Sequence, residues 1–171
     1  MTTEEHRKEA PKELHVGVIT VSDTRSAAMK EGRDEDESGK IIQERLKESE
    51  FTSERVVIPD EPDDLGEKLS EYLNDPEVDA IITTGGTGIA KRDITIDVAR
   101  KFFDKELPGF GEFLRRKGYE MVGIFGILTR TTLGIAGKKP IFCLPGAPNS
   151  VRVGMDLITS DLAHIVKHAR E

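Results

Sequence analysis

Short apolar segments alternate with amphipathic segments along this chain, which is the pattern of an α/β protein. Leu14–Val21, Arg55–Pro59 and Asp79–Thr84 are short, largely apolar runs rich in β-branched residues. Runs of this kind predict strands that are buried in a parallel sheet. Elsewhere, apolar residues recur every three or four positions, which predicts amphipathic helices. The predicted helices are Gly39–Glu50, one that starts at Pro62, one that follows Asp93 and Thr95 and runs to about Phe103, Pro108–Val122, and one that starts at Pro148.

Two further β-like segments lie close together near the C-terminus. Thr131–Ala136 and Pro140–Leu144 are separated only by residues 137–139, and this spacing predicts a hairpin. The strand–helix alternation before them predicts right-handed βαβ crossovers and a mainly parallel sheet. We therefore expect a three-layer αβα sandwich with one antiparallel edge. The polar stretch Ser22–Glu37 is expected to be a long, mobile loop.

Length and composition fit one soluble domain. The chain has 171 residues, of which 36% are hydrophobic and 33% charged, so it can bury one core. The polar residues 1–13 are expected to be a frayed tail, and residues 14–171 are assigned to a single domain. No run of about 18 apolar residues occurs, and Cys143, the only cysteine, is expected to be buried and inert. We expect a cytoplasmic protein without a membrane partner.

The net charge of the chain narrows the range of partners. The sequence contains 25 basic and 32 acidic residues, which gives a formal charge of −7. A negative overall field repels polyanions at long range, so nucleic acid is disfavoured as a partner. Small phosphorylated substrates are still compatible, because local backbone N–H groups bind phosphate whatever the net charge.

Unusual loops follow three of the predicted strands, at Ser22, Gly85 and Pro145. In open parallel sheets the carboxyl ends of the strands lie along one edge, and ligands bind there. We therefore expect the chemistry of this chain to collect at that edge.

The strongest local signal is TTGGTG at residues 83–88, followed by KRDIT at residues 91–95. Gly85, Gly86, Thr87 and Gly88 offer backbone N–H groups and one hydroxyl, and the next helix N-terminus adds partial positive charge. Together these groups can form a phosphate cradle. Neither of the two common glycine motifs of nucleotide-binding proteins is present, so a purely structural turn is the alternative interpretation.

Two aspartates near strand ends are candidate metal ligands. Asp60 follows the second predicted strand, and Asp93 follows the glycine-rich segment. Two carboxylates at the ends of neighbouring strands can hold the Mg²⁺ that accompanies ATP. In the alternative interpretation, Asp93 caps the following helix and Asp60 is an ordinary loop acid.

The segment with Pro145, Gly146 and Pro148 joins a predicted strand to the last helix. The first N–H groups of that helix would face the same edge as the glycine loop, which predicts a second anion site. The alternative is a rigid turn that only positions the helix.

Four more polar residues are candidates with two interpretations each. Ser22 and Asp23 either contribute to the site or begin an ordinary Asx-type turn. Thr129 offers a hydroxyl, and Arg130 pairs either with a phosphate or with a surface carboxylate.

Five motifs occur in a fixed order. They are VITVSDTRS with the later DEDESG, TTGGTGIAKRDIT, PGFGEFLRRKGYE, LTR, and LPGAPNSV. In this combination the chain resembles the MogA/MoaB family of molybdopterin adenylyltransferases. The segments GYE at residues 118–120 and HIVK at residues 164–167 are similar to the MoaB branch. Ile96-Asp97, Thr129 and Lys40 depart from the residues that are usual in the family.

The resemblance implies an α/β enzyme that transfers AMP from Mg-ATP to the phosphate of molybdopterin and releases pyrophosphate. It implies that Asp60 and Asp93 are catalytic and bind Mg²⁺, and that the glycine loop, residues 85–88, binds the nucleotide. The other candidates would line a shared cleft: Ser22, Asp23, Thr129, Arg130, Pro145, Gly146 and Pro148.

The resemblance also implies partners and leaves alternatives. It implies a homo-oligomer, a trimer or a hexamer, and a downstream metal-insertion protein in a molybdenum or tungsten pathway. Since a fold does not determine a function, two other functional hypotheses remain. One is a non-catalytic molybdopterin-binding scaffold, and the other is a nucleotide pyrophosphatase on the same fold.

Overall fold

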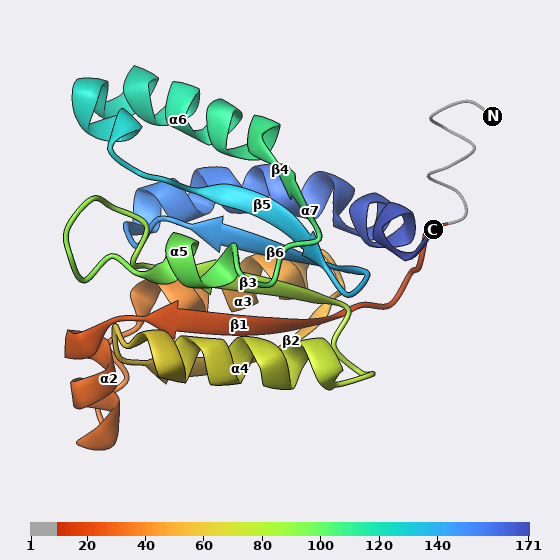
Figure 1. The fold of residues 1–171 in the computed structure, drawn as a ribbon, viewed down its shortest axis with the longest axis horizontal. Coiled ribbons are helices and arrows are strands. Elements are labelled where there is room, and N and C mark those ends of the chain that lie inside the picture. Colours follow the sequence, from red (N-terminus) through yellow and green to blue (C-terminus); the bar gives the residue numbers. More distant parts are fainter. Residues whose placement is uncertain (1–9) are drawn as a thin grey trace.

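Six strands form one sheet in the computed structural model, which describes residues 10–171 (Figure 1). Their order is β2-β1-β3-β6-β5-β4, in which β2, β1, β3 and β6 are parallel and β5 is antiparallel to both of its neighbours. Most of the tail expected over residues 1–13 lies outside the described residues. The strands are β1 (His15–Val21), β2 (Thr52–Ile58), β3 (Ala80–Thr84), β4 (Lys105–Leu107), β5 (Thr132–Ala136) and β6 (Lys139–Leu144).

Helices cover both faces of the sheet, which gives three layers (Figure 1). α4 and α5 pack on one face, and α3 and α7 pack on the other, with α6 beside β5. The predicted three-layer α/β fold with one antiparallel edge is confirmed. No helix within residues 10–171 is both long and apolar enough to cross a membrane. The helices are α2 (Asp23–Lys30), α3 (Glu37–Glu48), α4 (Pro62–Asn74), α5 (Thr95–Ala99), α6 (Pro108–Val122), the 3₁₀ helix η1 (Gly123–Ile127) and α7 (Pro148–Arg170).

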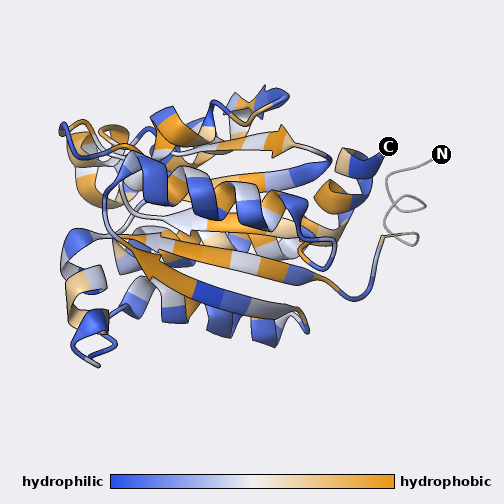
Figure 2. Ribbon diagram, turned by 60° about the horizontal axis from the view of Figure 1, so that its bottom comes forward, coloured by the Kyte–Doolittle hydropathy of each residue, from blue (hydrophilic) through white to orange (hydrophobic). Residues whose placement is uncertain are grey.

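The central strands are apolar because both of their faces are covered. Every residue of β3 is buried, and so is every residue of β1 except His15. In the first half of the edge strand β2, exposed and half-buried residues alternate instead. Figure 2 shows hydrophobic residues concentrated in the strands and hydrophilic residues on the outer helix surfaces. The hydrophobic pattern therefore reports how many faces of each strand are covered.

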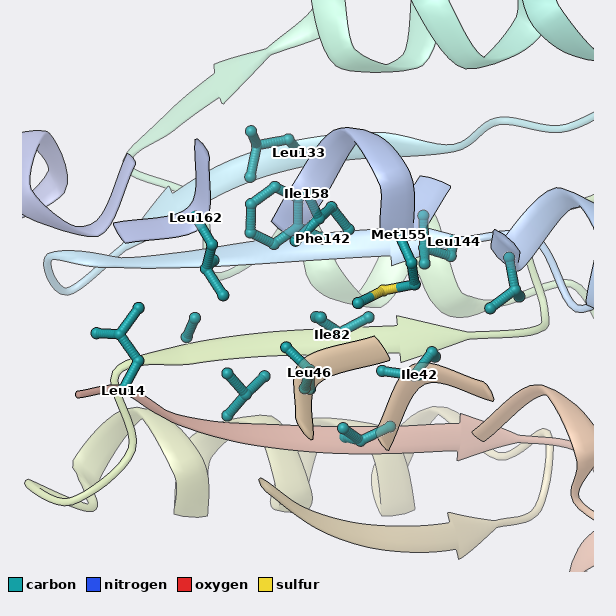
Figure 3. Packing of buried hydrophobic residues seen from close by; sticks show 14 of the residues in the cluster. Leu14, Ile42, Leu46, Ile82, Leu133, Phe142, Leu144, Met155, Ile158 and Leu162 are labelled. Atoms are coloured by element: carbon teal, nitrogen blue, oxygen red, sulfur yellow. The ribbon is translucent and has the colours of Figure 1, made fainter. Parts of the chain in front are cut away.

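One of the two hydrophobic cores lies between the sheet and helices α3 and α7 (Figure 3). Phe142 of β6 is fully buried there, and the ring of Phe110 packs edge-on against it, with 5.4 Å between the ring centroids. Ile42 of α3 and Met155 and Ile158 of α7 complete this region. Full burial of one such side chain contributes about 1.5–3 kcal/mol. The core therefore fixes α7, whose first turn lies at the carboxyl edge of the sheet.

The stretch that was expected to form a long loop after β1 is mostly helical, so that prediction was wrong. Ser22 caps α2, and its hydroxyl accepts a hydrogen bond from the N–H of Arg25 at 3.3 Å. Asp36 caps α3 in the same way and accepts from the N–H of Gly39 at 3.0 Å. Short polar side chains favour both loops and helix starts, and here they start helices. Only residues 31–36 separate α2 from α3.

Other element boundaries also differ from the prediction. β2 begins at Thr52 rather than Arg55, and α5 ends at Ala99 rather than near Phe103. Strand β4 and helix η1 were not predicted at all. All residues of β4 are exposed, so no hydrophobic period marks this strand.

The predicted hairpin joins β5 and β6. Gly137 and Lys138 at its tip have φ angles of 52° and 69°. Two consecutive residues with positive φ are what a type I′ turn requires, and this turn matches the twist of the paired strands. The hairpin supplies the antiparallel part of the sheet.

The single cysteine, Cys143, lies inside the core on β6. Its side chain is fully buried, and burial raises the pKa of the thiol to about 12. A neutral, enclosed thiol is a poor nucleophile. The expectation of a buried cysteine is confirmed, and the raised pKa favours an inert thiol.

Candidate active site

The segments that follow β1, β3 and β6 lie side by side at the carboxyl edge of the sheet. Thr20 of β1 pairs with Thr84 of β3, which in turn pairs with Leu144 of β6. The N–H of Gly85 donates to the carbonyl of Leu144 at 3.1 Å, so the glycine loop is joined to the end of β6. The structure thus brings together the three loops that the sequence singled out.

Two reciprocal hydrogen bonds join Asp23 to Asp60. The backbone N–H of Asp23 donates to the carboxylate of Asp60, and the backbone N–H of Asp60 donates to the carboxylate of Asp23, each at 2.9 Å. Beside them, the N–H of Ser22 donates to the carbonyl of Ile58 at 2.9 Å. The loops after β1 and β2 are therefore fixed to each other, and two carboxylates are held next to each other.

Burial raises the pKa of Asp60 above its ordinary value, because the charged carboxylate loses solvation. The negative charges of Asp23 and Asp93 raise this pKa as well. The hydrogen bond from the N–H of Asp23 and the positive charge of Arg92 act in the opposite direction. Asp60 therefore lies within electrostatic range of two other carboxylates, and a bound cation would relieve their repulsion.

Asp93 closes the glycine loop and does not cap a helix. Its carboxylate accepts a hydrogen bond from the N–H of Ala90 at 2.7 Å, and its own N–H donates to the carbonyl of Ala90 at 2.9 Å. The next helix, α5, has Ile94 at its N-cap and no side-chain cap. A Cβ atom at Gly88 would lie 2.6 Å from the Asp93 carboxylate, so glycine leaves room for this side chain.

The carboxylates at the carboxyl edge of the sheet could hold a metal ion only together with ligands from the substrate and water. Within residues 10–171, no group of three or more His, Cys, Asp or Glu side chains is arranged to hold a metal. Mg²⁺ in nucleotide enzymes is commonly held by one or two carboxylates together with substrate phosphates and water. Asp60 and Asp93 offer carboxylate oxygens of the kind that Mg²⁺ prefers, so these residues fit that arrangement.

The glycine loop requires glycine at its first two positions. Gly85 and Gly86 have φ angles of 97° and 65°. A Cβ atom at Gly85 would lie 2.3 Å from the carbonyl oxygen of Val21, and one at Gly86 would lie 2.4 Å from the Thr95 hydroxyl. Thr95 fixes the loop, because its hydroxyl donates to the carbonyl of Gly85 at 2.8 Å and its N–H to that of Gly86 at 3.0 Å.

The remaining N–H groups of this loop are available to a ligand. None of the hydrogen bonds among residues 10–171 uses the N–H groups of Gly86, Thr87 or Gly88. Consecutive N–H groups in such a turn form a concave site for anions. The geometry favours the phosphate cradle over the purely structural turn.

Arg130 fastens the glycine loop to the segment before β5. Its guanidinium donates to the carbonyls of Gly88 at 2.9 Å and Asp93 at 2.6 Å. It also forms an ion pair with Asp97 at 2.9 Å, while its backbone N–H donates to the carbonyl of Thr87 at 2.7 Å. Of the two partners considered from the sequence, the structure shows the carboxylate. Arg130 therefore positions the loop.

The loop after β6, residues 145–147, is fixed by hydrogen bonds from two other segments. The carbonyl of Pro145 accepts from the hydroxyl of Thr84, and the carbonyl of Gly146 accepts from the hydroxyl of Ser38, both at 2.8 Å. Helix α7 begins at once after this loop and has no side-chain cap. The N-terminal N–H groups of α7 therefore remain for a ligand at the edge.

A cavity of about 390 Å³ lies between this loop and helix α6. Its polar lining comes from Thr129, Asn149 and Ser150, while α6, η1 and α7 contribute a mostly apolar wall. The hydroxyl of Thr129 lies 2.8 Å from that of Thr87, so the cavity adjoins the glycine loop. A cavity of this size with few polar groups suits an organic ligand.

Asp36 stabilises the carboxyl edge of the sheet through hydrogen bonds to β1 and β2, although it was not predicted as a site residue. Its fully buried carboxylate accepts from the hydroxyl of Thr20 at 2.7 Å and from Arg55 at 2.8 Å. The signal was the acidic segment DEDESG, but the sequence does not show which of its acids is buried.

Comparison with known proteins gives the class of this chain. Residues 17–164 match the family described as "Probable molybdopterin binding domain", and the chain belongs to this family. The resemblance to the MogA/MoaB proteins is thereby confirmed.

Individual relatives are similar over their whole length. The molybdopterin adenylyltransferase of Pyrococcus furiosus is 45% identical over 175 residues, which cover 100% of both chains. Molybdenum cofactor biosynthesis protein B of Bacillus subtilis is 38% identical and covers 100% of this chain and 99% of its own. The crystal structure of the tungsten cofactor synthesizing protein MoaB from Pyrococcus furiosus has a TM-score of 0.81 at 43% identity, covering 95% of this chain and 100% of that one.

Proposed function

We propose that this chain is a molybdopterin adenylyltransferase, which transfers AMP from Mg-ATP to the phosphate of molybdopterin and releases pyrophosphate. The observation that carries the proposal is the position of Asp60 and Asp93 beside a glycine loop with unused N–H groups. The name of the full-length Pyrococcus furiosus relative supports the same activity.

In the proposed reaction, an oxygen of the molybdopterin phosphate attacks the α-phosphorus of ATP. A new P–O bond forms, the bond from the α-phosphorus to the bridging oxygen breaks, and pyrophosphate leaves with the electron pair. Because the attacking group is already an anion, no side-chain nucleophile is required, and positioning dominates. The N–H groups of the glycine loop and of the α7 N-terminus would bind phosphate oxygens and stabilise the charge that develops.

Asp60 and Asp93 would hold Mg²⁺, which neutralises phosphate charge when it is bound. The raised pKa of Asp60 supports this role, because it reflects burial of the carboxylate and, to a smaller extent, the negative charges of Asp23 and Asp93. Asp23 would orient Asp60 through their two reciprocal hydrogen bonds.

The pterin part of the substrate would occupy the cavity beside Thr129. This cavity has a largely apolar wall with a few hydroxyl and amide groups, which suits a flat, polar-edged ring system. Its contact with the glycine loop through Thr87 would bring the two substrates together.

Three implications of the family resemblance remain predictions: a cytoplasmic location, a downstream metal-insertion protein as partner, and a homo-oligomer, either a trimer or a hexamer. For the homo-oligomer, exposed apolar side chains gather on α6 and η1, among them Tyr119, Ile124 and Phe125. Surfaces of this kind commonly mark protein contacts. Light scattering of the purified protein measures the number of subunits.

Pyrophosphate release from ATP, measured with and without molybdopterin, tests the proposed function. We expect release that requires both molybdopterin and Mg²⁺ and that is lost in Asp60→Asn and Asp93→Asn variants. Hydrolysis of dinucleotides without a pterin would indicate the pyrophosphatase instead. Binding of molybdopterin without turnover would indicate a scaffold.

A further inference from the structure

A second cavity, about 330 Å³ in volume, shares Thr129 with the first cavity but is lined mainly by polar and charged residues. It lies where β4, β5 and the start of α6 meet the segment before β5. Three guanidinium groups line it, whereas only one carboxylate does. The charged lining residues are Arg100, Arg115, Arg130 and Glu106.

Two of these three arginines are neutralised by carboxylates. Arg100 donates to one oxygen of Glu106 through Nε at 3.0 Å and Nη2 at 2.9 Å. These bonds lower the pKa of Glu106, so this carboxylate is charged at neutral pH. Arg130 forms its ion pair with Asp97 at 2.9 Å. The two pairs together add no net charge to the cavity.

Arg115 is the cation that remains. It is half-buried, and its one hydrogen bond within residues 10–171 runs from Nη1 to the carbonyl of Thr131 at 3.0 Å. Among these residues it forms no ion pair. A guanidinium has five N–H donors, so four of them stay available. A partly desolvated cation without a counter-ion is unfavourable, and a bound anion would stabilise it.

The backbone around Arg115 favours a defined anion site. Gly111, one turn earlier on α6, lies against both the Thr131 carbonyl and the guanidinium, because a Cβ atom there would be 2.2 Å from that oxygen and 2.8 Å from Nη1. Pro108, the first residue of α6, also lines the cavity, and this helix has no side-chain cap. The partial positive charge of the helix N-terminus therefore adds to that of Arg115.

We propose that this cavity, the Arg115 cavity, binds a phosphate group. Arginine and phosphate match in charge and in bidentate geometry, and the cavity has an excess of one positive charge for one anionic group. The proposal goes beyond adenylyl transfer, since phosphate binding is measured without any turnover.

Arg130 connects the Arg115 cavity to the glycine loop. Arg130 lines the cavity and also binds the carbonyls of Gly88 and Asp93. A phosphate held by Arg115 therefore lies one side chain away from the loop proposed to bind the nucleotide. The phosphate could come from ATP or from a free inorganic anion.

Calorimetric titration of the full chain with inorganic phosphate tests the proposal with a matched pair of variants. Arg116 is the next residue on α6, but its side chain is 82% exposed and lies 3.7 Å from Glu120. We expect Arg115→Gln to weaken phosphate binding at least tenfold and Arg116→Gln to leave it unchanged. Equal phosphate affinity in the wild type and Arg115→Gln would overturn the proposal. Should Arg115→Gln not fold, Arg115→Lys keeps the charge without the bidentate geometry and is expected to bind more weakly than the wild type.

Titrations with ATP distinguish the two sources of the phosphate. If the phosphate belongs to ATP, Arg115→Gln weakens ATP binding as well, and inorganic phosphate competes with ATP. If the site takes a free anion, inorganic phosphate binds equally well with ATP present. Asp60→Asn separates this proposal from the enzymatic one, because it is expected to abolish adenylyl transfer and to retain the Arg115-dependent phosphate binding.

Discussion

Asp23 and Asp60 each accept a hydrogen bond from the backbone N–H of the other, at 2.9 Å in both cases. These two hydrogen bonds use one oxygen of each carboxylate and join the end of β1 to the loop after β2. The second oxygen of each carboxylate accepts no hydrogen bond within residues 10–171. The hydrogen bond from Asp23 thus fixes the Asp60 carboxylate and leaves its second oxygen unused by the protein.

The Asp60→Asn variant is expected to lose adenylyl transfer while it keeps its fold. The amide oxygen of asparagine still accepts the hydrogen bond from Asp23, but the negative charge that would bind Mg²⁺ is gone. We expect the rate of molybdopterin-dependent pyrophosphate release to fall by about 10²–10³, the size typical for loss of one stabilising group. Asp63→Asn, at an exposed position in the first turn of α4, is the control and should leave the rate unchanged.

The raised pKa of Asp60 predicts how its removal changes stability with pH. Asp60 binds its proton more tightly in the folded state, so its contribution to stability is complete below the ordinary value of 3.8. That contribution is lost as pH rises through the folded pKa. We therefore expect Asp60→Asn to unfold at a higher urea concentration than the wild type at pH 7.

The same comparison at lower pH is the control for that prediction. The difference in urea midpoint should shrink as pH falls toward about 4, because protonated aspartate resembles asparagine in charge. Mg²⁺ at pH 7 should stabilise the wild type more than the variant. A variant that is less stable than the wild type at pH 7 would contradict the electrostatic interpretation.

Gly86→Ala and Gly66→Ala are expected to have opposite effects on stability. At Gly86 the positive φ and the close Thr95 hydroxyl make a side chain unfavourable, so we expect a loss of about 1–3 kcal/mol and of activity. At Gly66, inside α4, a Cβ atom meets nothing within 4 Å, and alanine should stabilise the helix by about 0.5–1 kcal/mol. Urea denaturation of both variants measures the two signs.

Two neighbouring aspartates that bind the same arginine should differ strongly in their effect on stability. Asp36 is fully buried. Asp36→Ala removes the buried partner of Arg55, leaves the Thr20 hydroxyl without an acceptor and removes the cap of α3, so we expect a loss of about 3–5 kcal/mol. Asp34 pairs with Arg55 from a more exposed position, and Asp34→Ala should lose about 1 kcal/mol or less. Similar urea midpoints for the two variants would show that the buried pair contributes little.

The sequence predicted those strands and helices whose burial produces a hydrophobic pattern along the chain. β1 and β3 carry short, largely apolar runs and α7 carries a clear helical period, because tertiary packing covers whole faces of these elements. α2 was missed because it buries only Ser26 and Ala28, and its start is marked by a single hydroxyl cap. β4 was missed because all of its residues are exposed, so no alternation of hydrophobic and polar residues marks it.

For the site, the sequence predicted the place but not the partners. Strand ends of a parallel sheet must meet at one edge, so the loops could be placed together from their order alone. The bonds between Asp23 and Asp60 link residues 37 positions apart and use backbone N–H groups, which no motif reveals. Arg115 and Arg116 look equivalent in the sequence, but in the structure Arg115 is half-buried against Thr131 and Arg116 is exposed beside Glu120.

The enclosed position of Cys143 has a practical consequence for studies in solution. Since its thiol is buried and neutral, maleimide reagents should leave the folded native chain unlabelled. A cysteine introduced at Ile89, which is 73% exposed between Gly88 and Asp93, would then be the only reactive thiol. A fluorophore or spin label at that position would show whether the loop moves during turnover, without any need to remove the native cysteine.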